Sequence, residues 1–372
     1  MIHFRKNHFE FFLVAIFFLL ADFCFAAQTI DKTMQGDSNL SSGNSSATIL
    51  IYHRFGEERY PTTNVSVERF REQMLYLREN SYRVLPLQKL LSLLSTGKAF
   101  PAKTVAITID DGYKSVYETA WPVLKEFGYP FTVFLYVKAT DNKHWDYMDW
   151  NQVRELQTAG VDFQDHGYAH HRFGSRPQEM NEEEYIAWIR DDFTKSSTLI
   201  EKELGYKPTM LAYPYGEYNR VVVKTAKELG FTSLFSQDPG SVSHHTDFSF
   251  IPREPILGTD WSSMEHFAMV LDRVDLPIAD MMPDIQRLVH PAPPVFSARL
   301  LFPDRYKPGT LGIYVSELGW QPAQINNGYI SITNEKKLLR RANRIAVSGR
   351  EKVSGKTAIR FWLLLQEESS TN

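Results

Sequence analysis

The chain has 372 residues, which exceeds the usual size of one domain, and 43% of them are hydrophobic. We therefore expect one large core and a smaller second one. The net charge of −3 at pH 7 gives no electrostatic basis for binding nucleic acid, and we expect no such partner. Ordinary numbers of glycine and proline exclude a fibrous protein.

The first residues resemble a secretion signal. Arg5 and Lys6 precede the apolar run Phe11–Leu20, and Ala26 offers a small residue for cleavage. We expect residues 1–26 to direct export to the periplasm, the cell envelope or the medium, with an uncleaved amphipathic helix as the alternative. The apolar run is too short to span a bilayer, so no stable membrane span is expected after cleavage.

Residues 27–48 are rich in Ser, Asn and Gly, and their composition predicts a flexible leader. From Ile49 onward, strand-like and helix-like segments alternate, which predicts a parallel sheet, most simply closed into a barrel. Expected strands are 49–52, 104–109, 131–137, 161–163, 210–213 and 231–235, and expected helices are 67–79, 114–127, 150–158, 182–204 and 219–229.

Polar groups follow three of these expected strands. Asp110 and Asp111 end the strand at 104–109, His166 follows the strand at 161–163, and the turn 213–216 follows the strand at 210. The carboxyl ends of parallel strands meet at one edge of a sheet, where such folds carry out chemistry. Adjacent carboxylates with nearby imidazoles suit one metal ion and one base, a combination that indicates hydrolysis.

In these motifs the chain resembles the polysaccharide deacetylases, the NodB-homology group that forms carbohydrate esterase family 4. Thr108-Ile109-Asp110-Asp111-Gly112 is similar to the first motif of the family, His166 with His170 to the second, and 211–216 to the third. The resemblance covers residues 49–289 and implies an α/β fold, a distorted (β/α) barrel with fewer than eight full units.

The resemblance also implies roles for single residues. Asp111, His166 and His170 would bind a divalent metal, usually Zn²⁺, with Co²⁺ or Ni²⁺ as alternatives. Asp110 would be the general base, and the backbone N–H of Tyr215 would stabilise the oxyanion.

One ligand has an alternative. His171 also has a spacing from His166 that permits metal contact, but it falls where the family usually carries Pro, which favours His170.

The chain departs from the common family pattern at several positions. Ala212 occupies the place of an Arg that orients the base, and Asp165 replaces a small hydroxyl residue. The late Leu-x-His motif, which supplies the general acid in many members, has no clear counterpart, so the general acid is unassigned. His290 is a candidate substitute, but its position beside a linker is the favoured interpretation. Together with 52–55 and 251–253, these features resemble the branch that acts on biofilm poly-N-acetylglucosamine.

The sequence changes character after Val289. Residues 290–294, His-Pro-Ala-Pro-Pro, have the composition of a stiff linker, and residues 295–372 contain short β-rich stretches typical of a small all-β, sandwich-like domain. This domain could bind glycan through Trp320 or Tyr329, or pack on the barrel as an accessory.

The expected function is metal-dependent removal of N-acetyl groups from a polysaccharide that contains GlcNAc. The substrate partner would be poly-GlcNAc, peptidoglycan or a related polymer. One alternative is a non-catalytic glycan-binding protein on the same fold. A glycoside hydrolase using Asp110, Asp111 and Glu217 is a weaker alternative, because such enzymes place two carboxylates on opposite sides of a bond.

Overall fold

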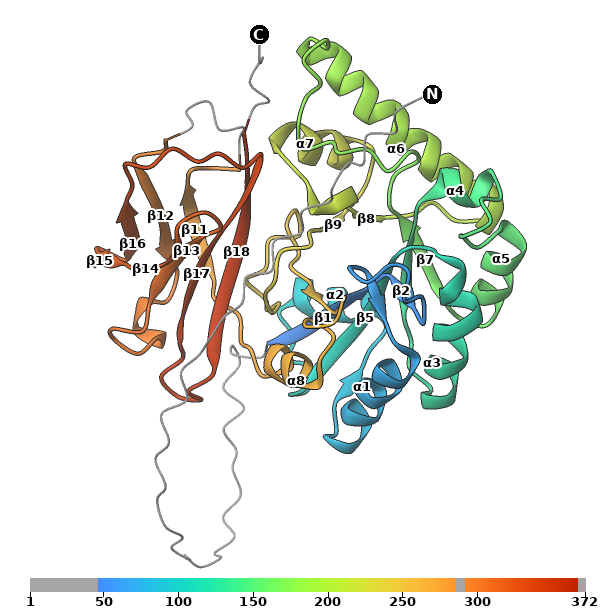
Figure 1. Ribbon diagram of the computed structural model, residues 1–372, viewed down its shortest axis with the longest axis horizontal. Helices are drawn as coiled ribbons and strands as arrows, with labels where there is room; N and C mark the ends of the chain where they lie inside the picture. The colour runs from blue at the N-terminus through green and yellow to red at the C-terminus, as the bar shows by residue number, and fades with distance from the viewer. Residues whose placement is uncertain (1–45, 286–291, 367–372) are drawn as a thin grey trace, which may run out of the picture. The chain divides into compact units, whose positions relative to one another are not determined.

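The computed structural model describes residues 46–285 and 292–366 (Figure 1). The expected signal at 1–26, nearly all of the leader at 27–48 and His290 lie outside the described residues. Within the described ranges, no helix is long and apolar enough to cross a membrane.

A parallel sheet forms the centre of the first region, in the order β10-β1-β5-β6-β7-β8-β9, with β4 paired to β5. Ile251 forms a parallel bridge with Phe235 of β9, and Glu254 pairs with Leu50 of β1, so residues 251–255 connect the two ends of the sheet. The expected distorted barrel is confirmed. Its strands are β1(Ala47–Tyr52), β4(Arg83–Val84), β5(Thr104–Asp111), β6(Thr132–Leu135), β7(Asp162–Asp165), β8(Met210–Ala212), β9(Ser233–Phe235) and β10(Glu254–Pro255), with a separate pair β2(Arg54–Phe55) and β3(Asn64–Val65).

Helices accompany these strands (Figure 1). Three of them, α1, α5 and α6, begin and end where the sequence predicts. Each start is defined by a side chain that caps it, Ser66 for α1, Asp149 for α5 and Asn181 for α6. The helices are α1(Val67–Glu79), α2(Leu87–Thr96), α3(Trp121–Phe127), α4(Val137–Asp141), α5(Trp150–Thr158), α6(Glu182–Leu204), α7(Arg220–Glu228) and α8(Met264–Leu271), with short 3₁₀ turns at Pro214–Gly216 and Pro303–Arg305.

The single helix expected at 114–127 is divided. Val116–Ala120 form a π-helical turn, and α3 begins only at Trp121, directly before Pro122. Inside a helix, proline breaks a hydrogen bond and clashes with the preceding turn. At the first turn no N–H is needed, so proline is tolerated there and the α-helix begins beside it.

Two antiparallel sheets form the second region, with strand orders β11-β12-β16-β15 and β14-β13-β17-β18. Phe296 and Ile330 from one sheet share a buried core with Ile345 and Trp362 from the other, so the expected all-β, sandwich-like region is confirmed. The strands are β11(Ile278–Met282), β12(Val295–Leu300), β13(Gly312–Val315), β14(Gly319–Pro322), β15(Gln324–Asn326), β16(Tyr329–Thr333), β17(Ala342–Arg350) and β18(Thr357–Leu365).

Both expected domain limits differ in detail from the observed elements. Strand β1 begins at Ala47, two residues before the expected start of the fold. Strand β11 pairs with β12, so the sandwich takes a strand from before residue 289. Of the expected linker at 290–294, residues 290 and 291 lie outside the described part, and the carbonyls of Pro293 and Pro294 accept hydrogen bonds from Asn334.

Candidate active site

The paired carboxylates lie where strand β5 ends. Asp110 is fully buried and Asp111 is 6% exposed. Asp111 has a φ of 71° and Gly112 a φ of 74°, so the chain turns sharply after the strand. A Cβ at Gly112 would lie 2.8 Å from a methyl carbon of Leu135, which makes glycine necessary there.

Three potential ligands converge beside this turn. Oδ1 of Asp111 lies 3.1 Å from Nε2 of His170 and 3.4 Å from Nε2 of His166, and the two Nε2 atoms are 3.2 Å apart. Oδ1 of Asp111 is buried and accepts no well-aligned hydrogen bond. The structure thus brings together the three residues for which the family resemblance implies metal binding.

The tautomer of His166 is defined by its other nitrogen. Nδ1 lies 2.8 Å from the carbonyl oxygen of Ala212 at the end of β8, an acceptor to which only an N–H can donate. With the proton on Nδ1, the neutral ring directs the lone pair of Nε2 toward Asp111 and His170. Such an arrangement is typical of histidines that bind metals.

Electrostatic interactions keep the two aspartates ionised. Burial by itself raises the pKa of Asp111, but His170 and His166 outweigh it and hold that pKa well below its ordinary value. For Asp110, burial is likewise opposed by Arg253 and His166, and its pKa is lowered. Burial lowers the pKa of His166, whereas Asp110 and Asp111 raise it, with a net increase.

A buried arginine binds Asp110 from a part of the chain that the third motif does not include. Arg253 donates to both carboxylate oxygens, at 2.6 Å and 2.8 Å, and to the carbonyl of Ser236 at 3.0 Å. The third motif does lack the usual Arg, as the sequence indicates, and has Ala212 where the family usually carries it. The guanidinium that contacts Asp110 comes instead from the strand segment 251–255, which closes the barrel.

His53 is a residue of the site that the sequence interpretation missed. It follows strand β1 directly, is 7% exposed, and its Nδ1 has no hydrogen-bond partner. Tyr52 of β1 pairs with Ile109 of β5, so the next residues, His53 and Asp110, lie at neighbouring strand ends. Burial lowers the pKa of His53, and the charges of Asp111 and Asp110 partly oppose that shift. The rule that strand ends carry polar site residues, applied to β1, would have found it.

The loop that carries both histidines is held by two buried carboxylates. Asp192 of α6 accepts from the backbone N–H groups of Tyr168 and Ala169, at 2.7 Å and 2.9 Å. Asp165 accepts from the N–H of Gly167 at 2.7 Å and the hydroxyl of Ser196 at 2.8 Å. Burial raises the pKa of Asp165 to about 7, because these hydrogen bonds only partly offset it. The unusual Asp before the first histidine is thus a support for the loop.

Tyr215 lies next to the cluster, and His171 does not belong to it. The ring of Tyr215 contacts the ring of His170 at 4.5 Å between centroids, and Arg172 lies 3.7 Å above the tyrosine ring. His171 packs against Trp188 instead, at 4.9 Å. Glu217 forms ion pairs with Arg172 and Arg341 and is not among the clustered carboxylates.

Three of the eight non-glycine residues with positive φ in the described part of the chain belong to this site. Asp111, His170 and Tyr215 all adopt positive φ, at 71°, 54° and 60°. Each such residue costs on the order of 1–3 kcal/mol and is retained where the surrounding structure requires it. The three come from different strand ends, so the strain marks the place where the ends meet.

Buried charge, converging ligand atoms and local strain at one edge of a (β/α) barrel mark a candidate metal site of the kind found in metal-dependent hydrolases. The family model of polysaccharide deacetylases matches residues 97–234, which include Asp110, Asp111, His166, His170 and Tyr215. Residues 97–234 thus form a domain similar to the polysaccharide deacetylases, and the relatives with the more specific name are hydrolases that act on carbon–nitrogen bonds other than peptide bonds. The resemblance inferred from the motifs is confirmed.

Several relatives carry a more specific name. A poly-β-1,6-N-acetyl-D-glucosamine N-deacetylase of Staphylococcus aureus is 26% identical over 208 residues, which are 55% of this chain and 71% of that protein. The enzyme of the same name from Escherichia coli is 25% identical over 63% of this chain, and the match spans only 38% of its length. Among solved structures, a Streptococcus pyogenes deacetylase in complex with acetate has the same fold, with a TM-score of 0.54 and 22% identity over 61% of this chain and 99% of that chain.

Proposed function

We propose that the protein is an exported, metal-dependent de-N-acetylase that releases acetate from a polymer of GlcNAc. The observation that carries this proposal is the convergence of Asp111, His166 and His170 within 3.4 Å beside the buried Asp110. Relatives named poly-β-1,6-GlcNAc N-deacetylases support this polymer over peptidoglycan. The apolar run at 11–20 supports export.

The residues present fit a divalent cation, with zinc first and cobalt or nickel as alternatives. Two imidazole nitrogens and one carboxylate oxygen form a ligand set of the kind that catalytic metal sites use, with a further position left for water or substrate. The buried, unpartnered Oδ1 of Asp111 is the atom that such an ion would satisfy. A bound cation would act as a Lewis acid: it would polarise the acetamide carbonyl and lower the pKa of the attacking water.

Asp110, oriented by Arg253, would remove the proton from the attacking water. Asp110 accepts the proton of the attacking water, and its bidentate contact with Arg253 fixes the direction of the carboxylate and keeps it ionised. The N–H of Tyr215 remains our proposal for an oxyanion donor, supported by the position of that residue beside His170.

His53 would return a proton to the leaving amine. It lies at the end of β1, next to the end of β5 that carries Asp110, is buried, and has an unpartnered Nδ1. The ring, which burial keeps neutral, would first take up the proton that Asp110 removes from the water and would then donate it to the amine nitrogen as the C–N bond breaks; the charges of Asp110 and Asp111 favour the protonated ring in between. The proposal fills the role that the sequence left unassigned.

A non-catalytic glycan-binding protein is the second candidate, and the structure offers a specific argument against it. A protein that only binds glycan has no need of ionised buried carboxylates or of strained backbone at three strand ends, both of which lower stability.

Acetate release from poly-β-1,6-GlcNAc tests the proposed function. We expect release by protein loaded with Zn²⁺ or Co²⁺, loss after chelation, and a reduction of at least about a thousandfold in His166→Ala and Asp110→Asn. His171→Ala is the matched control, because that ring packs on Trp188. Undiminished release by both site variants would contradict the site, and release of reducing ends without acetate would indicate a glycoside hydrolase.

A further inference from the structure

A row of aromatic rings runs from the candidate metal site to the protein surface. It begins at His170 and continues through Tyr136, Tyr147 and His144 to Trp145, with successive centroids 5.3, 5.5, 5.3 and 5.9 Å apart. The first rings are partly buried, and Trp145 at the end is 62% exposed. The exposed indole is thus the outer end of a row of rings whose inner end is one of the candidate metal ligands.

The loop that carries Trp145 is fixed from below. Asp146 is 6% exposed and accepts from Arg54 at 2.6 Å and from Arg59 at 3.3 Å. The N–H of Met148 donates to the carbonyl of Gly112, and Tyr147 forms a bridge with Tyr113, so the loop is attached to the residues that follow Asp111. Trp145 is held outward by a rigid base, which reduces the entropy lost when a ligand covers it.

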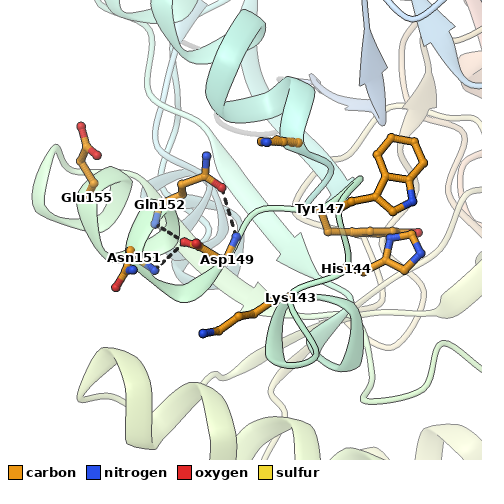
Figure 2. A pocket seen from close by; sticks show the side chains of 9 residues that line it. Lys143, His144, Tyr147, Asp149, Asn151, Gln152 and Glu155 are labelled. Atoms are coloured by element: carbon orange, nitrogen blue, oxygen red, sulfur yellow. Dashed lines mark hydrogen bonds between the residues drawn. The ribbon is translucent and has the colours of Figure 1, made fainter.

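Two hollows adjoin this indole. One, of about 260 Å³, is lined by Trp145, His144 and Tyr147 and by residues at the start of α5; in Figure 2, His144 and Tyr147 lie on one side of Asp149 and Asn151 and Gln152 on the other. The other, of about 350 Å³, lies toward Glu57 and Arg59. Lys114 lines both hollows.

The combination of groups identifies the ligand chemistry. An aromatic face attracts the C–H face of a sugar ring, and surrounding amide, carboxylate and ammonium groups bind its hydroxyls. Arg59 lies 4.7 Å from the indole but leaves most of it open. Acidic and basic groups are mixed around both hollows, which does not suit a partner of one strong charge.

We propose that Trp145 forms a sugar-binding subsite that holds a unit of the glycan beyond the unit under reaction, with the aromatic row as the track between them. This inference rests on the proposed function, because the unit at Trp145 belongs to the same polymer whose acetyl group reaches Asp111. The subsite gives the enzyme a preference for long chains over short ones.

Substrate length provides the test. Acetate release is measured with the β-1,6-linked GlcNAc disaccharide and hexasaccharide, and hexasaccharide binding is measured separately by calorimetry. For Trp145→Ala we expect the ratio of kcat/KM for hexasaccharide to that for disaccharide to fall about tenfold, with weaker hexasaccharide binding. Trp145→Phe should restore part of both. Trp320→Ala, at a tryptophan that is 39% exposed on β14, is the matched control.

The outcomes separate this inference from the proposed function. An equal loss on both substrates would mean that Trp145 only supports the site, and an equal effect of Trp320→Ala would move glycan binding to the sandwich; each overturns the subsite. Acetate release with an unchanged length ratio in Trp145→Ala also overturns it. If no substrate releases acetate but Trp145→Ala still weakens hexasaccharide binding tenfold, the subsite stands and the deacetylase function fails.

Discussion

The barrel and the sandwich differ in what they bury. At one edge the barrel buries His53, Asp110, Asp111, His166 and Arg253 together. In the described residues of the sandwich from Val295 onward, the buried polar side chains are Asn343 and Glu351, and the shared core is apolar. Burying a charge costs several kcal/mol unless it is paired, so a protein retains such groups where they perform chemistry. The contrast supports our proposal that the reaction takes place in the barrel, and it favours a structural role for the sandwich.

Contacts between the two regions fit this division. Arg341 of the sandwich pairs with Glu217, and Arg344 donates to Asp238 at 3.2 Å. The hydroxyl of Tyr218 accepts from the backbone N–H of Leu363 at 3.1 Å. Glu217 and Tyr218 directly follow the turn that contains Tyr215, so the sandwich supports the site from behind.

Removing Arg253 should have the largest effect, because this side chain contributes both to the stability of the fold and to the proposed catalysis. Arg253→Met leaves Asp110 buried without its cation, and we expect a loss of about 3–5 kcal/mol in the free energy of unfolding, measured in urea. The pKa of Asp110 should rise, since Arg253 lowers it, and the acidic limb of the pH profile of acetate release should move to higher pH.

Arg273→Met is the matched control for this change. Arg273 pairs at 2.7 Å with buried Glu254, the residue that follows Arg253, and not with Asp110. It should lower stability without moving the pH profile. Equal behaviour of the two variants in both measurements would show that Arg253 does not act on the base.

A cavity in the sandwich should separate stability from catalysis. Trp362 is 1% exposed, packs in the shared core, and donates to the carbonyl of Pro283 at 3.2 Å. Trp362→Ala should lower the free energy of unfolding by about 3–5 kcal/mol, and Trp362→Phe by less. Well below the unfolding temperature, kcat should be unchanged, and a fall in kcat of the folded variant would assign the sandwich a part in the reaction.

Acid should destabilise the barrel through His266, with a smaller effect. Burial and the nearby Arg273 lower the pKa of His266 to about 4. The unfolded chain therefore binds a proton more readily, and stability is lost as pH falls from about 6.5 to about 4, by up to about 3 kcal/mol. His266→Phe should reduce the difference in Tm between pH 7 and pH 5. The described sandwich residues 292–366 contain no histidine, so an unchanged pH dependence in His266→Phe would place the acid sensitivity in other barrel groups.

Local patterns predicted much of the architecture. Helices α1, α5 and α6 begin and end at the predicted residues, because caps at Ser66, Asp149 and Asn181 are encoded next to periodic apolar residues. Short elements such as β10 and β14 were missed, since two to four residues carry too little periodicity to be distinguished from a loop.

The sequence by itself determined the alternation of strands and helices and the family motifs with Asp110, Asp111, His166 and His170, because these signals are encoded by residues close together in the chain. Only the tertiary structure placed Arg253 on Asp110, 143 positions away in the chain. It also placed His53 at the strand end next to Asp110 and connected Trp145 to His170 through a row of rings. These contacts form because the barrel closes and brings together the ends of strands that are far apart in the chain. The distance of two residues along the chain does not predict such a contact.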